Sequence, residues 1–251
     1  MPSWTWAAAS RRGTSHERLG EKRQDAFRTL FVAASDTVVL VACDGAGSAA
    51  RGGAGSAIAA RVLSRCARDV LAEGRWPSDD DVWDWIDLAR DRIAAAARRR
   101  ELVPRDFATT VVMMISNGSD TLVVHVGDGA AVVRDAATGA WRAVSWPAQG
   151  EYASTTFFLT DDGGPQVRIA REAVAVDRLA AFTDGIERLA LDFAAERAHA
   201  PFFSGMSKPV AAAEVSGWNL PLSTKLGDYL SSPAVNARTD DDKTLILACL
   251  R

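Results

Sequence analysis

Cysteine is scarce in this sequence, and long apolar runs are missing. The 251 residues include three cysteines, Cys43, Cys66 and Cys249, and an odd count without regular spacing does not make a disulfide framework. No apolar run reaches the roughly 18 residues that span a bilayer. Residues 1–12 lack the charged and then apolar pattern of a secretory signal. We therefore expect a cytoplasmic protein with reduced thiols and no membrane association.

An excess of positive charge is missing as well. The formal net charge is -3, which argues against a nucleic-acid partner, because phosphate backbones call for a basic surface. The basic run at 98–100 is interpreted as a solvated helix end. Hydrophobic residues make up 48% and charged residues 24%, as in ordinary globular proteins. Without internal repeats, low-complexity tracts or linkers, we expect one domain over residues 1–251.

The hydrophobic pattern predicts an α+β fold. Strands are expected at 4–10, 26–33, 37–43, 108–116, 121–126, 130–134, 141–145, 154–160, 166–171, 178–182 and 243–250, and helices at 51–73, 79–102, 186–200, 208–215 and 224–230. The run at 37–43 is apolar on both faces, which indicates a central strand. Strands and helices do not alternate regularly, so the order favours a four-layer αββα sandwich, two antiparallel β-sheets flanked by helices.

Four aspartates share a position relative to the strands. Asp44, Asp128 and Asp184 each follow an apolar strand and precede a glycine, in ACDGAG, HVGDGA and FTDGIE. Asp241, in DDDKTLIL, precedes the last strand. A single Asp-Gly pair is more typical of a turn. Three such strand ends with a fourth acidic cluster favour an all-oxygen site, the kind that Mg²⁺ or Mn²⁺ prefers.

Six segments occur in an order that resembles a known family. They are GEKRQDAF, VACDGAGSAARGG, FATTVVMMI, LVVHVGDGAAVVR, LAAFTDGIERL and DDDKTLIL, and they span about residues 15–250. The chain resembles the type 2C, metal-dependent serine/threonine protein phosphatases, especially the bacterial branch. The resemblance implies hydrolysis of phosphoserine or phosphothreonine by a metal-activated water, without a phosphoenzyme. It also implies a phosphorylated protein as substrate, the target of a serine/threonine kinase.

The resemblance also implies a role for each acidic residue. Asp44 would bridge two metal ions, and the Gly45 carbonyl would ligate one of them. Asp184 and Asp241 would complete the shell of the second ion. These three aspartates would act in catalysis through the metal-bound water. Two further metal-site residues complete the set: Asp25 as support and Asp128 at a third, weaker ion. Because Asp240 and Asp242 flank Asp241, either of them could be the metal ligand in its place if the match to the family is shifted by one residue.

Other positions depart from the family pattern. Ala46 stands where the family often has a histidine proposed as general acid, and the candidates to replace it are His16, His125 or water. Gln24 stands where many members have glutamate. The family's phosphate-binding arginine is not cleanly placed. Three cations precede Asp25 and are candidates for phosphate binding: Arg18, Lys22 and Arg23.

Two alternatives stay open at this point. One is a catalytically weak or inactive phosphatase-like domain that regulates or binds a partner, which the departures favour. The other is a different metallohydrolase, such as a nuclease or a small-molecule phosphatase. The composition of residues 146–152 also suggests a flap beside the site.

Overall fold

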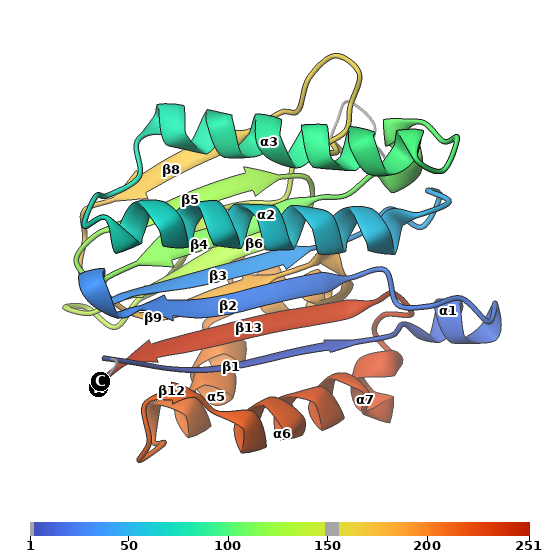
Figure 1. The fold of residues 1–251 in the computed structure, drawn as a ribbon. Helices are drawn as coiled ribbons and strands as arrows, with labels where there is room; N and C mark the ends of the chain where they lie inside the picture. The colour runs from blue at the N-terminus through green and yellow to red at the C-terminus, as the bar shows by residue number, and fades with distance from the viewer. Residues whose placement is uncertain (1–2, 149–155) are drawn as a thin grey trace.

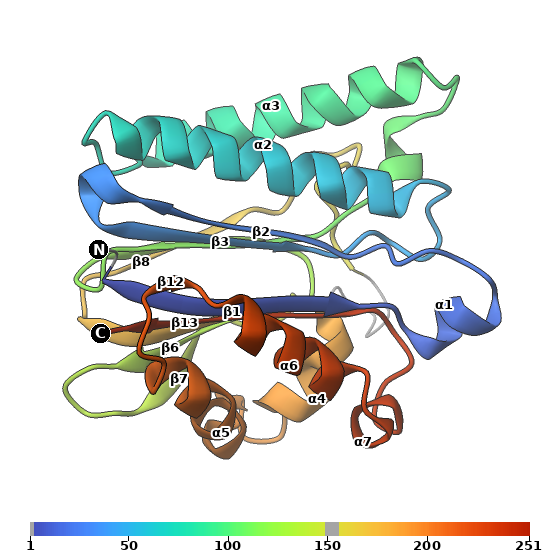
Figure 2. The same ribbon diagram turned by 60° about the horizontal axis from the view of Figure 1, so that its bottom comes forward.

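The protein forms four layers. The structure, a computed structural model, describes residues 3–148 and 156–251. Helices α2 (Gly52–Ala72) and α3 (Asp79–Arg98) cover one sheet (Figure 1), and α5 (Ala200–Ala211) and α6 (Leu220–Leu230) cover the other. The two sheets lie face to face between these helix layers, as Figure 2 shows from a second direction. This arrangement confirms the αββα sandwich predicted from the sequence.

The sheet under α2 and α3 has five strands, and all its neighbouring pairs are antiparallel. In sheet order they are β2 (Ala26–Val32), β3 (Thr37–Cys43), β4 (Val111–Ser116), β5 (Thr121–Val126) and β8 (Arg168–Glu172). The hairpin between β4 and β5 turns at Gly118, whose φ of 92° is open to glycine. Asn-Gly pairs are common in such hairpin turns, because glycine adopts this backbone conformation without strain.

The sheet under α5 and α6 has six strands. In sheet order they are β12 (Gly217–Trp218), β1 (Trp4–Arg11), β13 (Lys243–Leu250), β9 (Val176–Phe182), β6 (Ala130–Asp135) and β7 (Trp141–Ser145). The short β12 runs parallel to β1, and the other pairs are antiparallel. A separate ribbon joins β10 (Leu191–Asp192) to β11 (Arg197–Ala198).

Side-chain alternation along the central strands builds three apolar layers. In β3, Val39 and Val41 pack under α2 and α3, while Val38 and Leu40 pack between the two sheets. In β13, Leu247 faces the other helix layer and Ile246 the space between the sheets. Successive side chains of a strand point to opposite faces, so a strand that is apolar throughout must be covered on both. This confirms the central position predicted for 37–43.

Short helices complete the chain. They are α1 (Thr14–Arg18), α4 (Glu187–Ala190) and α7 (Pro233–Asn236), with 3₁₀ turns η1 (Ala33–Ser35), η2 (Pro104–Phe107) and η3 (Asp184–Ile186). No helix in the described part of the chain is both long and apolar enough to cross a membrane.

Several sequence predictions fail in the connecting segments. The expected helix at 186–200 is a single turn followed by the β10–β11 ribbon, and the helix expected at 208–215 begins at Ala200 and ends at Ala211. Residues 156–160 form no strand, and 154–155 lie outside the described residues. The helix expected to reach 102 ends at Arg98. These segments have weak periodicity, and tertiary packing decides their conformation.

Candidate metal centre

The topology explains why distant aspartates meet. Strands β3 and β5 are both antiparallel to β4, so their C-terminal ends lie at the same edge of the sheet. In the other sheet, β9 and β13 are antiparallel, which places the end of β9 beside the start of β13. Asp44 follows β3, Asp128 follows β5, Asp184 follows β9 and Asp241 precedes β13. Face-to-face packing of the sheets then gathers the four carboxyl groups at one edge.

Three of these carboxyl groups form a compact cluster. Asp44, Asp128 and Asp184 each offer one oxygen, and these oxygens lie within 4.8 Å of one another. The Oδ1 atoms of Asp128 and Asp184 are buried and receive no hydrogen bond from the described residues. A carboxylate oxygen enclosed without a donor is costly unless a cation or proton approaches it. The cluster therefore has the geometry and the donor atoms of a site for a hard divalent cation.

Electrostatic repulsion within the cluster gives the same indication. Burial raises the pKa of Asp44 well above its ordinary value, and the neighbouring charges of Asp25 and Asp184 raise it further. Burial also raises the pKa of Asp184 well above its ordinary value, with further contributions from Asp128 and Asp241. Carboxyl groups with raised pKa values are held together against their mutual repulsion. A bound divalent cation would relieve that repulsion, so the residues present fit a metal.

The backbone of Asp44 is fixed by the two threonines of the FATT segment. The Asp44 carbonyl accepts hydrogen bonds from Thr110 N–H and Thr109 Oγ1, each at 2.8 Å, and Asp44 N–H donates to Thr110 Oγ1 at 3.1 Å. Both threonines are buried. The two threonines therefore hold the backbone of Asp44 by hydrogen bonds. The next residue, Gly45, pairs with Thr109 in an isolated bridge.

Asp25 lies behind the cluster and joins the two sheets. Its Oδ2 accepts hydrogen bonds from Thr183 Oγ1 at 2.8 Å and from Thr244 Oγ1 at 2.6 Å, so strands of the opposite sheet hold a residue that leads into β2. Burial raises the pKa of Asp25 to about 6, although hydrogen bonds from Asp44 and the two threonines lower it. The sequence predicted a supporting role for Asp25, and the two threonines were not foreseen.

The pKa of Asp25 gives a pH-dependent prediction for the metal-free protein. The folded state binds a proton between the ordinary pKa of 3.8 and about 6, while the unfolded state does not, so stability falls as pH rises through this window. We expect the melting temperature of the metal-free protein to drop by on the order of 5 °C from pH 5 to pH 7. Calorimetry measures this change.

The same scan on Asp25→Asn is the control, because that side chain does not titrate and the drop should shrink. Saturating Mn²⁺ should reverse the trend, since metal binding requires ionised carboxylates. A metal-free protein that becomes more stable over this range would contradict the assignment.

Asp241 lies beside the cluster rather than within it. It raises the pKa of Asp44 and Asp184, and it lines a cavity of about 220 Å³ together with Asp184 and Glu187. Its neighbour Asp240 is exposed and pairs with Arg18 at 2.9 Å, so it points away. Of the three consecutive aspartates, Asp241 is therefore the one whose charge acts on Asp44 and Asp184.

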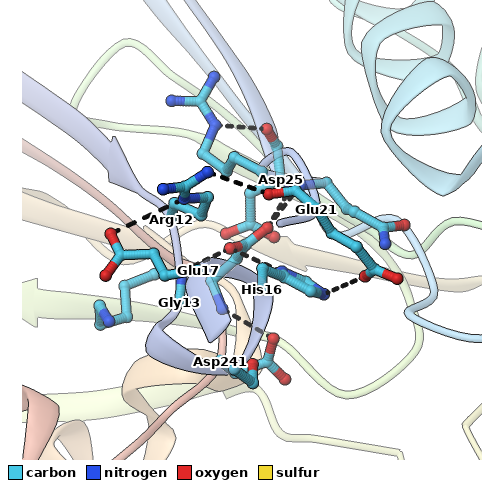
Figure 3. A network of polar contacts seen from close by, with 12 residues as sticks. Arg12, Gly13, His16, Glu17, Glu21, Asp25 and Asp241 are labelled. Carbon is cyan, nitrogen blue, oxygen red and sulfur yellow. Dashed lines mark hydrogen bonds and ion pairs between the residues drawn. The ribbon is translucent and has the colours of Figure 1, made fainter. Parts of the chain in front are cut away.

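Asp242 holds the N-terminal loop against the metal edge. This buried carboxylate accepts hydrogen bonds from the backbone N–H of Gly13 at 2.6 Å and of Gln24 at 2.5 Å, and it lies 3.0 Å from His16 Nδ1. Figure 3 shows this network from close by, with Gly13, His16, Asp25 and Asp241 labelled. The Asp242 side chain thus positions both neighbouring acids. Asp241 is the preceding residue, and Asp25 follows Gln24, whose N–H donates to Asp242. This role of Asp242 could not be predicted from the sequence.

Removing the Asp242 carboxylate tests its contribution to stability. Asp242→Ala leaves two buried N–H groups without an acceptor, and we expect a loss of about 2–4 kcal/mol in the free energy of unfolding. Urea titration of the metal-free protein measures this loss. Asp240→Ala is the matched control, because its exposed ion pair is worth at most about 1 kcal/mol. Equal effects at the two positions would contradict the positioning role.

The three cations predicted as candidates for phosphate binding have different partners in the structure. Arg23 donates from Nε to the Asp25 carbonyl at 3.0 Å and from Nη1 to the Ser10 carbonyl at 3.1 Å. Arg18 pairs with Asp240. Lys22 is exposed and lines a groove beside the N-terminal turn of α2. Within the described residues Lys22 forms no ion pair, whereas Arg18 pairs with Asp240 and Arg23 donates to two backbone carbonyls.

The two histidines considered as proton donors differ in environment. His125 is buried in β5, its Nδ1 lies 2.5 Å from Ser145 Oγ, and burial lowers its pKa to about 3. It stays neutral and enclosed. His16 lies in helix α1. Burial lowers its pKa, but Asp242 and other acids raise it above the ordinary value. Of the two histidines, His16 is therefore the one whose pKa the neighbouring acids raise.

Two more residues border the cluster and were not foreseen. Thr156 Oγ1 donates to Asp128 Oδ2 at 2.5 Å, which orients this carboxylate. Glu187 lines the cavity, and burial and the charge of Asp128 raise its pKa to about 7. Of the predicted flap at 146–152, residues 149–152 lie outside the described residues. Trp146 is described, and its ring packs edge-on against Phe193 with centroids 5.5 Å apart.

The αββα sandwich with a carboxylate cluster at the common edge of its sheets defines a protein with a candidate metal centre. Comparisons with known proteins name the family. The family model "Protein phosphatase 2C" matches residues 12–231. Serine/threonine-protein phosphatase 3 of Escherichia coli is 38% identical, in an alignment that covers 98% of each chain.

Solved structures share the fold at low sequence identity. A serine/threonine phosphatase from Staphylococcus aureus superposes with a TM-score of 0.64 at 17% identity, over 98% of this chain and 94% of its own. One from S. agalactiae gives a TM-score of 0.63 at 14% identity, over 99% and 100% of the two chains. The chain belongs to the protein phosphatase 2C family, and it is a metal-dependent protein serine/threonine phosphatase.

Proposed function

We propose that this phosphatase holds Mg²⁺ or Mn²⁺, two or three ions, on the carboxyl groups of Asp44, Asp128, Asp184 and Asp241, with the Gly45 carbonyl as a further ligand and Asp25 as support. The observation that carries the proposal is the compact group of Asp44, Asp128 and Asp184, with oxygens within 4.8 Å of one another. Oxygen donors of this kind select hard cations over the softer metals that thiolates and imidazoles prefer.

The bound ions would supply an activated water and neutralise charge on the phosphoryl oxygens. The chain itself provides the rigid placement of the ligands. Thr109 and Thr110 fix the backbone of Asp44, Thr183 and Thr244 fix Asp25, and Thr156 orients Asp128. Ligands held by hydrogen bonds before the substrate arrives need little rearrangement during the reaction.

The residues near the cluster favour direct attack by water. Cys43, the thiol nearest in sequence to Asp44, is fully buried, and burial together with the charges of Asp25 and Asp44 raises its pKa far above the ordinary value. A thiol acts as a nucleophile only as the thiolate, which this environment disfavours. No phosphoenzyme is therefore needed in the proposed reaction.

The proposed substrate is a protein that carries phosphoserine or phosphothreonine placed by a serine/threonine kinase, in the cytoplasm. Lys22, exposed beside the start of α2, is the cation best placed to contact the phosphorylated segment. The 38% identity to a serine/threonine-protein phosphatase, over 98% of each chain, supports this substrate class.

Metal removal tests the proposal. We expect hydrolysis of p-nitrophenyl phosphate and of a phosphothreonine peptide with Mn²⁺, loss of both with EDTA, and recovery when Mn²⁺ is restored. Calorimetry in the same buffers should show a higher melting temperature with Mn²⁺, because a ligand that binds only the folded state stabilises it. Binding of Mn²⁺ without any turnover would indicate the inactive regulatory domain instead. Turnover that survives EDTA would contradict the metal assignment.

A further inference from the structure

A groove runs along the outer side of the α2–α3 pair, away from the sheet that these helices cover. Its volume is about 570 Å³. Its apolar lining comes from Ile58, Val62, Cys66 and Leu88, and its charged lining from four arginines and one aspartate. These charged residues are Arg61, Arg65, Arg92, Arg99 and Asp69. Nothing in the phosphatase reaction uses this surface.

The charge of the groove is mostly unpaired. Arg65 lies 3.8 Å from Asp69, which Arg68 also contacts at 2.7 Å. Within the described part of the chain, Arg61, Arg92 and Arg99 make no ion pair. The lining therefore carries three more positive than negative charges, on a protein whose formal net charge is -3. A concentration of free guanidinium groups against the overall charge indicates an anionic partner.

The apolar floor has helical spacing and is incompletely covered. Ile58, Val62 and Cys66 follow one another at four-residue intervals on α2, and each is only partly buried, whereas Leu63 and Ala67 beside them are fully buried against the sheet. Leu88 on α3 is 37% exposed. Eight residues of helix rise about 12 Å, which matches roughly two turns of another helix laid in the groove.

We propose that the α2–α3 groove docks an acidic amphipathic helix of a partner protein. Apolar side chains of that helix, spaced by three or four residues, would cover Ile58, Val62 and Leu88. Its flanking aspartates or glutamates would meet Arg61, Arg92 and Arg99, because the guanidinium fork pairs well with carboxylates. A concave groove with a narrow apolar floor fits a row of convex side chains better than a flat anionic bilayer.

Fluorescence anisotropy with designed peptides tests the proposal. The probe is a labelled helical peptide of about 14 residues, with leucines at i, i+4 and i+8 and glutamates on both flanks. The binding variant is Arg61→Glu with Arg92→Glu. The matched control is Arg28→Glu with Lys208→Glu, two exposed cations on other elements, with the same change in net charge. We expect the binding variant to bind at least about tenfold more weakly than the wild type, and the control to bind within about twofold.

Three outcomes would overturn the proposal. The first is equal binding by the wild type and the groove variant. The second is undiminished binding of a peptide whose leucines are replaced by serine, which would show attraction of charge alone. The third is binding to phosphatidylglycerol vesicles but not to the peptide, which would make the groove a membrane-binding surface. Turnover of p-nitrophenyl phosphate should be unchanged in both double variants, which shows that they are folded.

Discussion

Replacement of Asp44 by asparagine should abolish turnover while it stabilises the metal-free protein. The carboxyl group of Asp44 lies among Asp128 and Asp184. Burial raises its pKa well above the ordinary value, and the charges of Asp25 and Asp184 raise it further. Asparagine keeps the shape, removes the charge and binds a divalent cation poorly. We expect turnover to fall by at least about a thousandfold, which corresponds to roughly 4 kcal/mol. The free energy of unfolding without metal should rise by on the order of 1 kcal/mol.

Two measurements on the same variant separate this explanation from simple damage. A misfolded variant would lose both activity and stability, whereas the metal-site explanation predicts opposite signs for the two. Asp91→Asn, an exposed position on α3, makes the same chemical change away from the cluster and should alter neither quantity. Wild-type turnover in Asp44→Asn would remove Asp44 from the metal centre.

Replacement of Gly185 by alanine should damage both stability and activity. A Cβ at this position would lie 1.8 Å from the carbonyl oxygen of Asp242, a backbone atom that cannot rotate away. The segment that carries Asp184 would therefore be pushed from the start of β13 and from Asp241. We expect a loss of about 2–4 kcal/mol in the free energy of unfolding. Turnover should fall by about a hundredfold, because catalytic geometry tolerates little displacement.

Gly205→Ala provides the matched control for this experiment. Gly205 lies inside α5, no atom stands within 4 Å of the Cβ it would gain, and its φ is not positive. Alanine should stabilise the helix there by roughly 0.5–1 kcal/mol. The same substitution is thus expected to have opposite signs at two positions, as measured by urea titration. If both variants gained stability, the close contact at Gly185 would be unimportant.

The central strands could be predicted because their residues leave few alternatives. The runs at 37–43, 121–126 and 243–250 are apolar and β-branched, and each forms a strand over the same residues. Residues 186–200 mix charged and small residues without a clear period, and helix was the wrong choice there. The η3 turn contacts β13, α4 contacts α5, and β11 contacts β7, and local sequence does not encode these contacts.

The acidic cluster was visible as a pattern, but its supports were not. Asp-Gly pairs at three strand ends predicted that Asp44, Asp128 and Asp184 would meet, and they do. The glycines have a physical reason: a Cβ at Gly45, Gly129 or Gly185 would lie 1.8–2.6 Å from the backbone of a neighbouring segment. By contrast, the hydrogen bonds from Thr183 and Thr244 to Asp25 join residues more than 150 positions apart, and no local signal indicates such pairs.

The carboxyl groups of the metal edge come from the strand ends of both sheets. An ion held there would link the two sheets, because separating them would break at least one bond between the ion and its ligands. Motions that separate the two sheets should therefore be slower when the ion is bound. This slowing should extend to residues far from the ion. Loss of the ion would weaken the packing of one sheet on the other, where Asp25 is hydrogen-bonded to Thr183 and Thr244.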